Sequence, residues 1–118
     1  MGISNAVGRF GEEVAVQHLR GIGMAVVDRD WRCRDGELDV VARDGDVLVF
    51  CEVKTRRGTR YGRPVEAITP AKAKRLRDLA RMWLADSRSH AGGLRFDVVE
   101  VLLSTQRGTQ VEHLRGVL

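Results

Sequence analysis

The stretch from Gly36 to Lys54 constrains the fold of this chain more than any other segment. It contains two runs of β-favouring residues with Asp44 and Gly45 between them. This dipeptide is typical of two-residue hairpin turns, which need a positive φ that aspartate and glycine tolerate. We therefore expect an antiparallel hairpin whose turn lies at Asp44-Gly45.

Charged residues gather at the open end of this predicted hairpin. Side chains alternate between the faces of a strand, so Glu37 shares a face with Asp39. In the second strand, Glu52 shares a face with Lys54. The expected turn pairs Asp39 with Phe50 and makes Asp39 a diagonal neighbour of Glu52, about 7–8 Å away. Two carboxylates at this spacing can hold a divalent cation between them.

Elsewhere the hairpin is apolar on both faces. The face with the charged residues also carries Val41, Leu48 and Phe50, and the other face carries Leu38, Val40, Ala42, Val47, Val49, Cys51 and Val53. A sheet that is apolar on both faces is covered on both sides. We therefore expect the hairpin at the centre of a mixed α/β domain, with its charged end at a cleft or at the rim of the sheet.

Residues 5–22 are predicted to form a helix that ends at a pair of glycines. At helical spacing its apolar side contains Val7, Phe10, Gly11, Val14, His18 and Ile22, extended by Ala15 and Leu19. Glu12 lies at the edge of this side, whereas Glu13 is expected in solvent. A carboxylate at a buried edge needs a partner, but an acid in the first turns of a helix is also favoured by the helix dipole. Both interpretations of Glu12 stay open.

The rest of the pattern predicts three more strands and one more helix. We expect a loop over 55–68, a helix that starts at Pro70, and strands over 24–31, 94–103 and 111–114. No repeat or linker divides the 118 residues, so we expect a single domain over residues 1–118.

The location of the chain is predicted from what the sequence lacks. The N-terminus has no signal-sequence pattern, and no apolar run approaches the roughly 20 residues that span a membrane. Cys33 and Cys51 have no metal-binding spacing and are expected as free thiols. These features predict a cytoplasmic protein with no membrane partner and no small-molecule cofactor.

Basic residues surround the single tyrosine and continue into the second helix. The candidate nucleic-acid contacts are Arg56, Arg57, Arg60, Tyr61, Lys72 and Arg75. Arginine and lysine bind phosphates, and an aromatic ring can stack on a base. A net charge of +4 agrees with a polyanionic partner. A solvated loop and a solvated helix face would explain the same residues.

The carboxylates predict a chemistry. Magnesium takes oxygen ligands and is often held by one or two carboxylates together with a substrate phosphate. Asp39 and Glu52 supply such ligands, the backbone carbonyl of Val53 can add another, and Glu12 is a candidate third carboxylate. Lys54 is expected to act as base or to stabilise charge. The predicted reaction is metal-assisted hydrolysis of a phosphodiester, and the alternative is a surface ion-pair cluster.

A family resemblance follows from these residues. Asp39, followed after twelve residues by Glu52-Val53-Lys54, resembles the PD-(D/E)xK nuclease signature, although Leu38 stands where that signature has proline. The segments GRFGEEVAVQHL, GELDVVARDGDVLVFCEVKTR, GRPVEAITPAKAKRL and LRFDVVEV closely resemble the YraN-like family, uncharacterised protein family 0102. This resemblance covers nearly the whole chain.

The resemblance implies a restriction-endonuclease-like α/β fold, a three-layer core in which helices flank a central mixed β-sheet. The resemblance also implies that this core is related to archaeal Holliday junction resolvases, which act as dimers on branched DNA. The catalytic groups of those enzymes are similar to Glu12, Asp39, Glu52 and Lys54 here. We therefore expect a DNA endonuclease that needs Mg²⁺ or Mn²⁺, and a homodimer. The alternatives are a non-catalytic nucleic-acid-binding module and an interaction scaffold.

Overall fold

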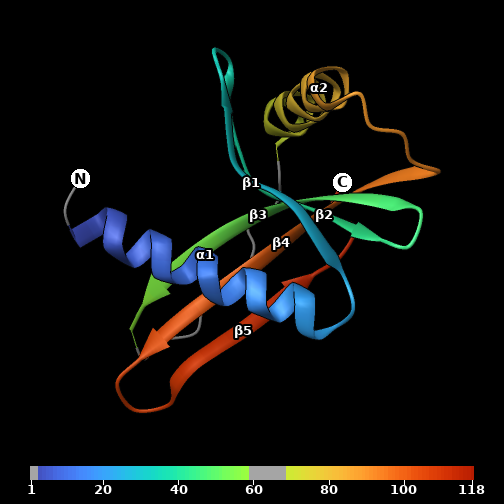
Figure 1. The fold of residues 1–118 in the computed structure, drawn as a ribbon. Coiled ribbons are helices and arrows are strands. Elements are labelled where there is room, and N and C mark those ends of the chain that lie inside the picture. The colour runs from blue at the N-terminus through green and yellow to red at the C-terminus, as the bar shows by residue number, and fades with distance from the viewer. Residues whose placement is uncertain (1–2, 59–68) are drawn as a thin grey trace.

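The computed structural model describes residues 3–58 and 69–118, which form two helices and five strands (Figure 1). In chain order these are α1 (Ile3–Gly21), β1 (Ala25–Cys33), β2 (Gly36–Asp44), β3 (Val47–Arg57), α2 (Pro70–Ser87), β4 (Gly93–Ser104) and β5 (Gly108–Leu114). The predicted elements are all present, but β3 runs three residues into the predicted loop and β5 starts three residues early. None of the helices in the described residues has the length and apolar character to cross a membrane.

The five strands form one mixed sheet in their sequence order. β3 and β4 are parallel, with α2 in the connection between them, and the other neighbouring strands are antiparallel. α1 covers one face and α2 covers the other, so the sheet is buried on both sides. The prediction of a mixed α/β sheet between helices is therefore confirmed.

The predicted hairpin register is wrong by two residues. Asp44 pairs with Val47 and Val41 pairs with Phe50, so the turn residues are Gly45 and Asp46. Gly45 has a φ of 61° and occupies the first central position, which is where a type II′ turn needs glycine. Over the paired part of the hairpin, residues 40–51, a shift of two residues keeps side chains on their predicted faces, because strand side chains alternate with a period of two.

α1 lies directly on β3 at Gly11. A side-chain carbon at this position would overlap the Thr55 hydroxyl group, so the close approach requires glycine. Ala15, Val16 and Leu19 are fully buried against the sheet. Phe10 and Ile22, predicted on this apolar side, are exposed because the helix is turned so that Gly11 and Ala15 face β3.

The opposite face of the sheet is packed by α2. Leu79, Ala80 and Trp83 pack there with Val41, Leu48 and Phe50, and the Trp83 ring meets Phe50 edge to face. Leu38, predicted on the face that α1 covers, belongs to this second cluster. It changes side because β2 stops pairing with β3 after Val40.

Beyond Val40, β1 and β2 continue as a two-stranded ribbon beside α2 (Figure 1). Two tryptophan hydrogen bonds link β1 to α2, one within the ribbon at Trp31 and one next to its start at Asp28. The indole nitrogen of Trp83 donates to Asp28 over 2.8 Å, and that of Trp31 donates to Asp86 over 3.2 Å. The ribbon is therefore fixed at an angle to the remaining sheet, which opens a space between β2 and β3.

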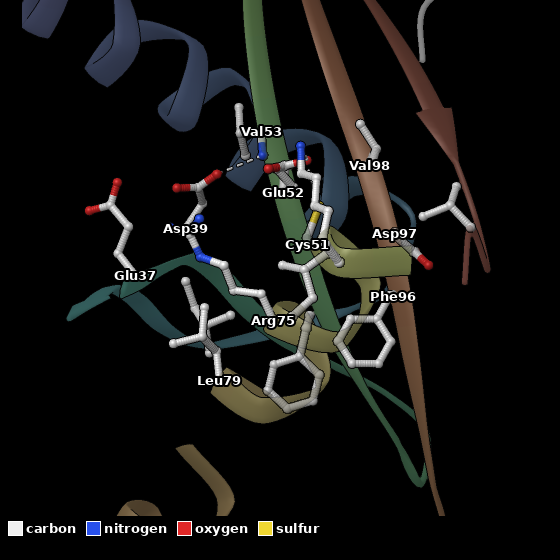
Figure 2. Close-up of a pocket in the computed structure, with 16 residues that line it drawn as sticks. Glu37, Asp39, Cys51, Glu52, Val53, Arg75, Leu79, Phe96, Asp97 and Val98 are labelled. Atoms are coloured by element: carbon white, nitrogen blue, oxygen red, sulfur yellow. Dashed lines mark hydrogen bonds and ion pairs between the residues drawn. The ribbon is translucent and has the colours of Figure 1, made fainter. Parts of the chain in front are cut away.

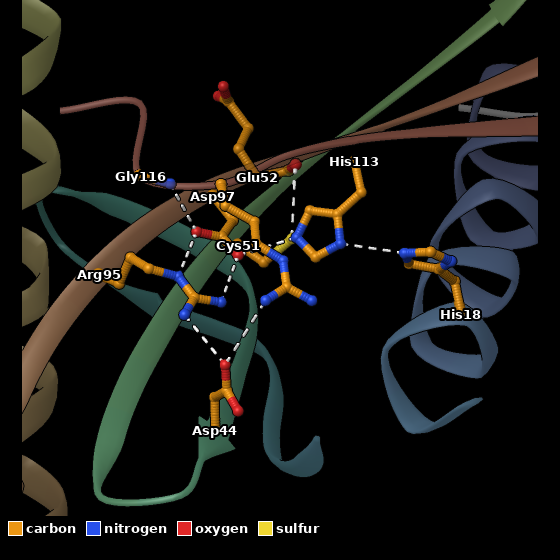
Figure 3. Close-up of polar contacts among 9 residues, drawn as sticks. His18, Asp44, Cys51, Glu52, Arg95, Asp97, His113 and Gly116 are labelled. Carbon is orange, nitrogen blue, oxygen red and sulfur yellow. Dashed lines mark hydrogen bonds and ion pairs between the residues drawn. The ribbon is translucent and has the colours of Figure 1, made fainter. Parts of the chain in front are cut away.

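The C-terminal segment packs within the chain through Asp97 (Figure 3). Arg95 contacts both oxygens of this buried carboxylate, at 2.9 and 3.0 Å, and His113 lies 2.8 Å from one of them. The backbone N–H of Gly116 donates to the other oxygen over 3.0 Å. Burial raises the pKa of Asp97, but these partners outweigh it and hold the pKa below its usual range. Asp97 thus anchors the end of the chain to β4.

Candidate active site

The space between β2 and β3 is organised by the Asp39 side chain. The last backbone pair of the two strands joins Val40 to Cys51. Past this point, the backbone N–H of Val53 donates to an Asp39 carboxylate oxygen over 2.8 Å (Figure 2). The carboxylate thus accepts a hydrogen bond from a β3 N–H group that has no backbone partner on β2. This hydrogen bond holds Asp39 beside Glu52.

Asp39 is an unusual carboxyl group because it lies half-buried among other acids. Burial is the main cause that raises its pKa to about 6, and the negative charges of Glu52, Glu37 and Asp30 add to this effect. The hydrogen bond from Val53 acts in the opposite direction but is outweighed. The site therefore disfavours negative charge unless a cation is present.

Glu52 presents a buried oxygen that has no hydrogen-bond donor. Its Oε2 atom is buried and without a hydrogen bond, although the Nζ atom of Lys72 lies 3.4 Å away. We interpret this contact as an ion pair without hydrogen-bond geometry, which leaves the coordinating capacity of Oε2 unused. Lys72, which the sequence suggests only as a DNA contact, is the cation beside this carboxylate.

Glu12 brings a third carboxyl group from α1. Its side chain is 13% exposed and that of Glu13 is 50% exposed, as helical periodicity predicts. Burial, followed by a hydrogen bond with Asp30 and the charge of Asp30, raises the pKa of Glu12 to about 7, although Arg29, 3.3 Å away, lowers it.

Asp30 is a residue that sequence reasoning missed. It has a φ of 50°, a backbone conformation in which aspartate is among the few tolerated residues, and it directs its carboxyl group toward Glu12. The signal available in the sequence was the presence of an acidic residue, Asp30, inside a predicted strand.

Two cavities meet at Asp39. The first has a volume of about 680 Å³ and contains Glu52, Lys72 and Arg75, with an apolar wall from both helix α2 and strand β4 (Figure 2). The second has a volume of about 770 Å³ and contains Glu12 and Asp30. Glu37, Asp39 and Val53 border both. Carboxyl groups from α1, β1, β2 and β3 thus line two adjoining cavities that share Asp39 in their walls.

Lys54 lies away from these cavities. It is paired in register with Glu100 of β4 and lowers the pKa of that buried carboxyl group, which burial raises overall. Among the described residues that line the two cavities Lys54 is absent. It shares a strand face with Glu52, but the lysine that reaches the carboxylates comes from α2.

The predicted nucleic-acid contacts divide into three groups. Lys72 and Arg75 line the first cavity, and Arg57 lines the second. Arg56 instead forms an ion pair with Glu100, at 3.4 Å. The remaining two, Arg60 and Tyr61, lie outside the described residues.

No preformed metal centre is visible within residues 3–58 and 69–118, because no three His, Cys, Asp or Glu side chains converge there as a metal-binding group. Asp39 and Glu52 offer two carboxylates and one buried oxygen without a donor. Two carboxylates with bound waters and a substrate phosphate are a common way of holding Mg²⁺. Cys33 and Cys51 are free thiols, as predicted.

Comparison with known proteins shows that the sequence of this chain is similar to those of one protein family. The profile described as "Uncharacterised protein family UPF0102" matches residues 11–101. A UPF0102 protein of Frankia alni is 55% identical over 116 residues, which are 98% of this chain and 97% of that protein. A UPF0102 protein of Streptomyces coelicolor is 53% identical over 119 residues, covering 99% of this chain and 92% of the relative.

Proposed function

We propose that this chain, which belongs to the uncharacterised protein family UPF0102, is a metal-dependent DNA endonuclease with a restriction-endonuclease-like fold. It would hydrolyse phosphodiester bonds in DNA, including branched DNA, with Mg²⁺ or Mn²⁺ as cofactor. The observation that carries the proposal is the pair formed by Asp39 and Glu52 at the point where β2 leaves β3.

The donor set fits a hard divalent cation. Asp39 is half-buried, and burial together with the charges of neighbouring acids raises its pKa, while the Oε2 atom of Glu52 is buried without a donor. A cation between them would relieve both conditions, because it neutralises the repulsion and supplies the missing partner. Asp39, Glu52 and the backbone carbonyl of Val53 would hold it, with Glu12 in support.

The side chains divide the remaining work. A bound Mg²⁺ or Mn²⁺ would lower the pKa of a water molecule and offset charge on the phosphate. Glu12, which shares a hydrogen bond with Asp30 and has its pKa raised to about 7 by burial and by Asp30, can hold or release a proton at the second cavity. Lys72 can neutralise a phosphate oxygen beside Glu52. Arg57 and Arg75 extend positive charge to the cavity mouths for the DNA backbone.

Two lysines compete for the catalytic role. The resemblance assigns it to Lys54, whereas the geometry favours Lys72, the one that lies 3.4 Å from Glu52. Lys54→Met and Lys72→Met separate the two, because the variant without the catalytic lysine will cleave DNA far more slowly at saturating metal. Under our assignment that variant is Lys72→Met.

The test is cleavage of labelled linear and branched DNA by the purified chain with Mg²⁺, with Mn²⁺ or with EDTA. We expect cleavage only with metal, and Glu52→Gln should reduce its rate about 100-fold or more, as for loss of a charge-stabilising group. Glu112→Gln, an exposed glutamate on β5, is the matched control and should retain the wild-type rate. Cleavage by Glu52→Gln at the wild-type rate would place the reaction elsewhere.

A second candidate function is nucleic-acid binding without turnover. The position of Lys54 favours it, since the lysine of the nuclease signature is paired in register with Glu100 of β4 and is absent from the described lining of both cavities. Salt-dependent DNA binding with no cleavage under any metal would support this module. Absence of both binding and cleavage would favour an interaction scaffold.

A further inference from the structure

The first cavity has an apolar part that hydrolysis of a phosphodiester does not require. Phe96 and Phe50 stack there, with ring centroids 5.5 Å apart and an interplanar angle of 27°. Phe50 is buried, but Phe96 is half-buried and lines the cavity together with Leu76 of α2 and Val117 (Figure 2). The cavity thus has an aromatic ring at its wall and carboxylates at its other end.

The C-terminal segment forms part of this wall and is held in place. The backbone N–H of Val117 donates to the Phe96 carbonyl over 2.8 Å, and that of Gly116 donates to Asp97 over 3.0 Å. Asp97 is itself fastened by Arg95 and His113 (Figure 3). Hydrogen bonds of the backbone and of a buried carboxylate therefore fix the position of this wall.

Two cations line the same cavity as the apolar wall and the carboxylates. Lys72 is half-buried beside Glu52, and Arg75 is exposed at the cavity. Among the described residues, the cavity lining thus combines a flat apolar surface, two cations and four acids, of which Asp39 and Glu52 are the proposed metal ligands. These match the three parts of a nucleotide at a cleavage site, namely its base, its phosphate and the bond to be hydrolysed. A volume of about 680 Å³ is within the roughly 300–1,000 Å³ of pockets that enclose small ligands.

We propose that this cavity binds one unpaired nucleotide of DNA, with its base against Phe96 and Leu76 and its phosphate at Lys72 and Arg75. The proposal rests on the proposed nuclease function and specifies its substrate class. A paired base must leave the stack to enter such a cavity, at a cost of a few kcal/mol, whereas an unpaired base enters without most of that cost. DNA with a bulge, gap or branch is therefore bound in preference to continuous duplex.

The test is binding without cleavage, in EDTA at low salt. Two DNA hairpins with the same stem, each closed by a non-nucleotide linker in place of a loop of bases, are compared, one with a single bulged 2-aminopurine and one with 2-aminopurine paired to thymine. We expect the bulged hairpin to bind about tenfold more tightly and its fluorescence to change on binding, while the paired hairpin shows no fluorescence change.

Matched variants locate the base. Phe96→Leu keeps the apolar volume and removes the aromatic face, so it should lower the preference for the bulge to about threefold or less. Phe10→Leu makes the same change at an exposed phenylalanine on α1 and should leave the preference unchanged. Leu76→Gln changes the opposite wall and should lower the preference even if Phe96→Leu folds poorly.

The outcomes separate this proposal from the nuclease function. Equal affinity for the two hairpins overturns the nucleotide cavity, and so does an unchanged preference in both Phe96→Leu and Leu76→Gln. DNA cleavage together with either result would leave the nuclease proposal standing. A bulge preference that depends on Phe96, without cleavage under any metal, supports the cavity and overturns the hydrolysis.

Discussion

The Asp39 carboxyl group has two roles that favour opposite protonation states. It satisfies the N–H of Val53 where two strands part, and it carries a charge among other acids. Burial raises its pKa from 3.8 to about 6. Between these values the folded protein binds a proton that the unfolded chain releases, so this carboxyl group destabilises the fold increasingly as pH rises.

Asp39→Asn should therefore stabilise the metal-free protein at neutral pH. The asparagine oxygen can still accept from Val53 but carries no charge. We expect the gain in unfolding free energy to be close to zero near pH 4 and to reach about 1–3 kcal/mol above pH 6, from the size of the pKa shift. Urea unfolding in EDTA at pH 4, 5, 6 and 7 measures this difference.

An exposed aspartate provides the comparison. Asp35 lies in the turn between β1 and β2, and Asp35→Asn should change the unfolding free energy by a few tenths of a kcal/mol at every pH. A difference between Asp39→Asn and the wild type that stays constant from pH 4 to pH 7 would contradict the pKa assignment.

At the scale of elements, the contact between α1 and β3 sets the position of Glu12. Gly11 is adjacent to Glu12 in the sequence, and it allows α1 to rest on Thr55. Any side chain at Gly11 would push the helix away from the strand that carries Glu52. The helix contact and the assembly of the carboxylates are therefore one structural feature.

Gly11→Ala should lower the unfolding free energy by about 1–3 kcal/mol, the usual effect of overpacking. Gly8→Ala is the matched control, since nothing lies within 4 Å of the added carbon. The control should be neutral or stabilising by up to about 1 kcal/mol, because alanine favours helix. Thermal unfolding followed by circular dichroism compares them, and equal stability of the two variants would exclude the close contact.

At the scale of the whole molecule, the clustered negative charge of the carboxylates couples metal binding to the free energy of unfolding. A ligand that binds only the folded state raises the unfolding free energy, by about 2.7 kcal/mol at a concentration 100 times its Kd. The carboxylates come from α1, β1, β2 and β3, so they are brought together only in the folded chain.

Mn²⁺ should therefore raise the Tm of the wild-type protein by several degrees, and EDTA should reverse the effect. Glu52→Gln should abolish most of this shift, and Glu112→Gln should retain it. Differential scanning calorimetry measures the shift without any DNA. A Tm that is insensitive to Mn²⁺ in the wild type would contradict a cation between Asp39 and Glu52, independently of any activity.

Much of the fold could be predicted because it depends on local pattern. Alternation with a period of two assigned most hairpin residues to their faces, and helical periodicity distinguished Glu12 from Glu13. The register of the hairpin could not be predicted in the same way. Glycine fits either central position of a turn, and the backbone at Gly45 depends on how the flanking strands pack.

The candidate site depended on both kinds of information. Local sequence was sufficient to select Asp39, Glu52 and Glu12 as carboxylates on buried or half-buried faces, because each face follows from the geometry of a single strand or helix. The association of Lys72 with Glu52, the approach of Asp30 to Glu12 and the separation of Lys54 arose from packing between distant elements. In particular, the tryptophan hydrogen bonds that link β1 to α2 open the space between β2 and β3. Long-range contacts of this kind leave no periodic pattern in the sequence, because they depend on how distant elements pack. Only the tertiary structure therefore shows them.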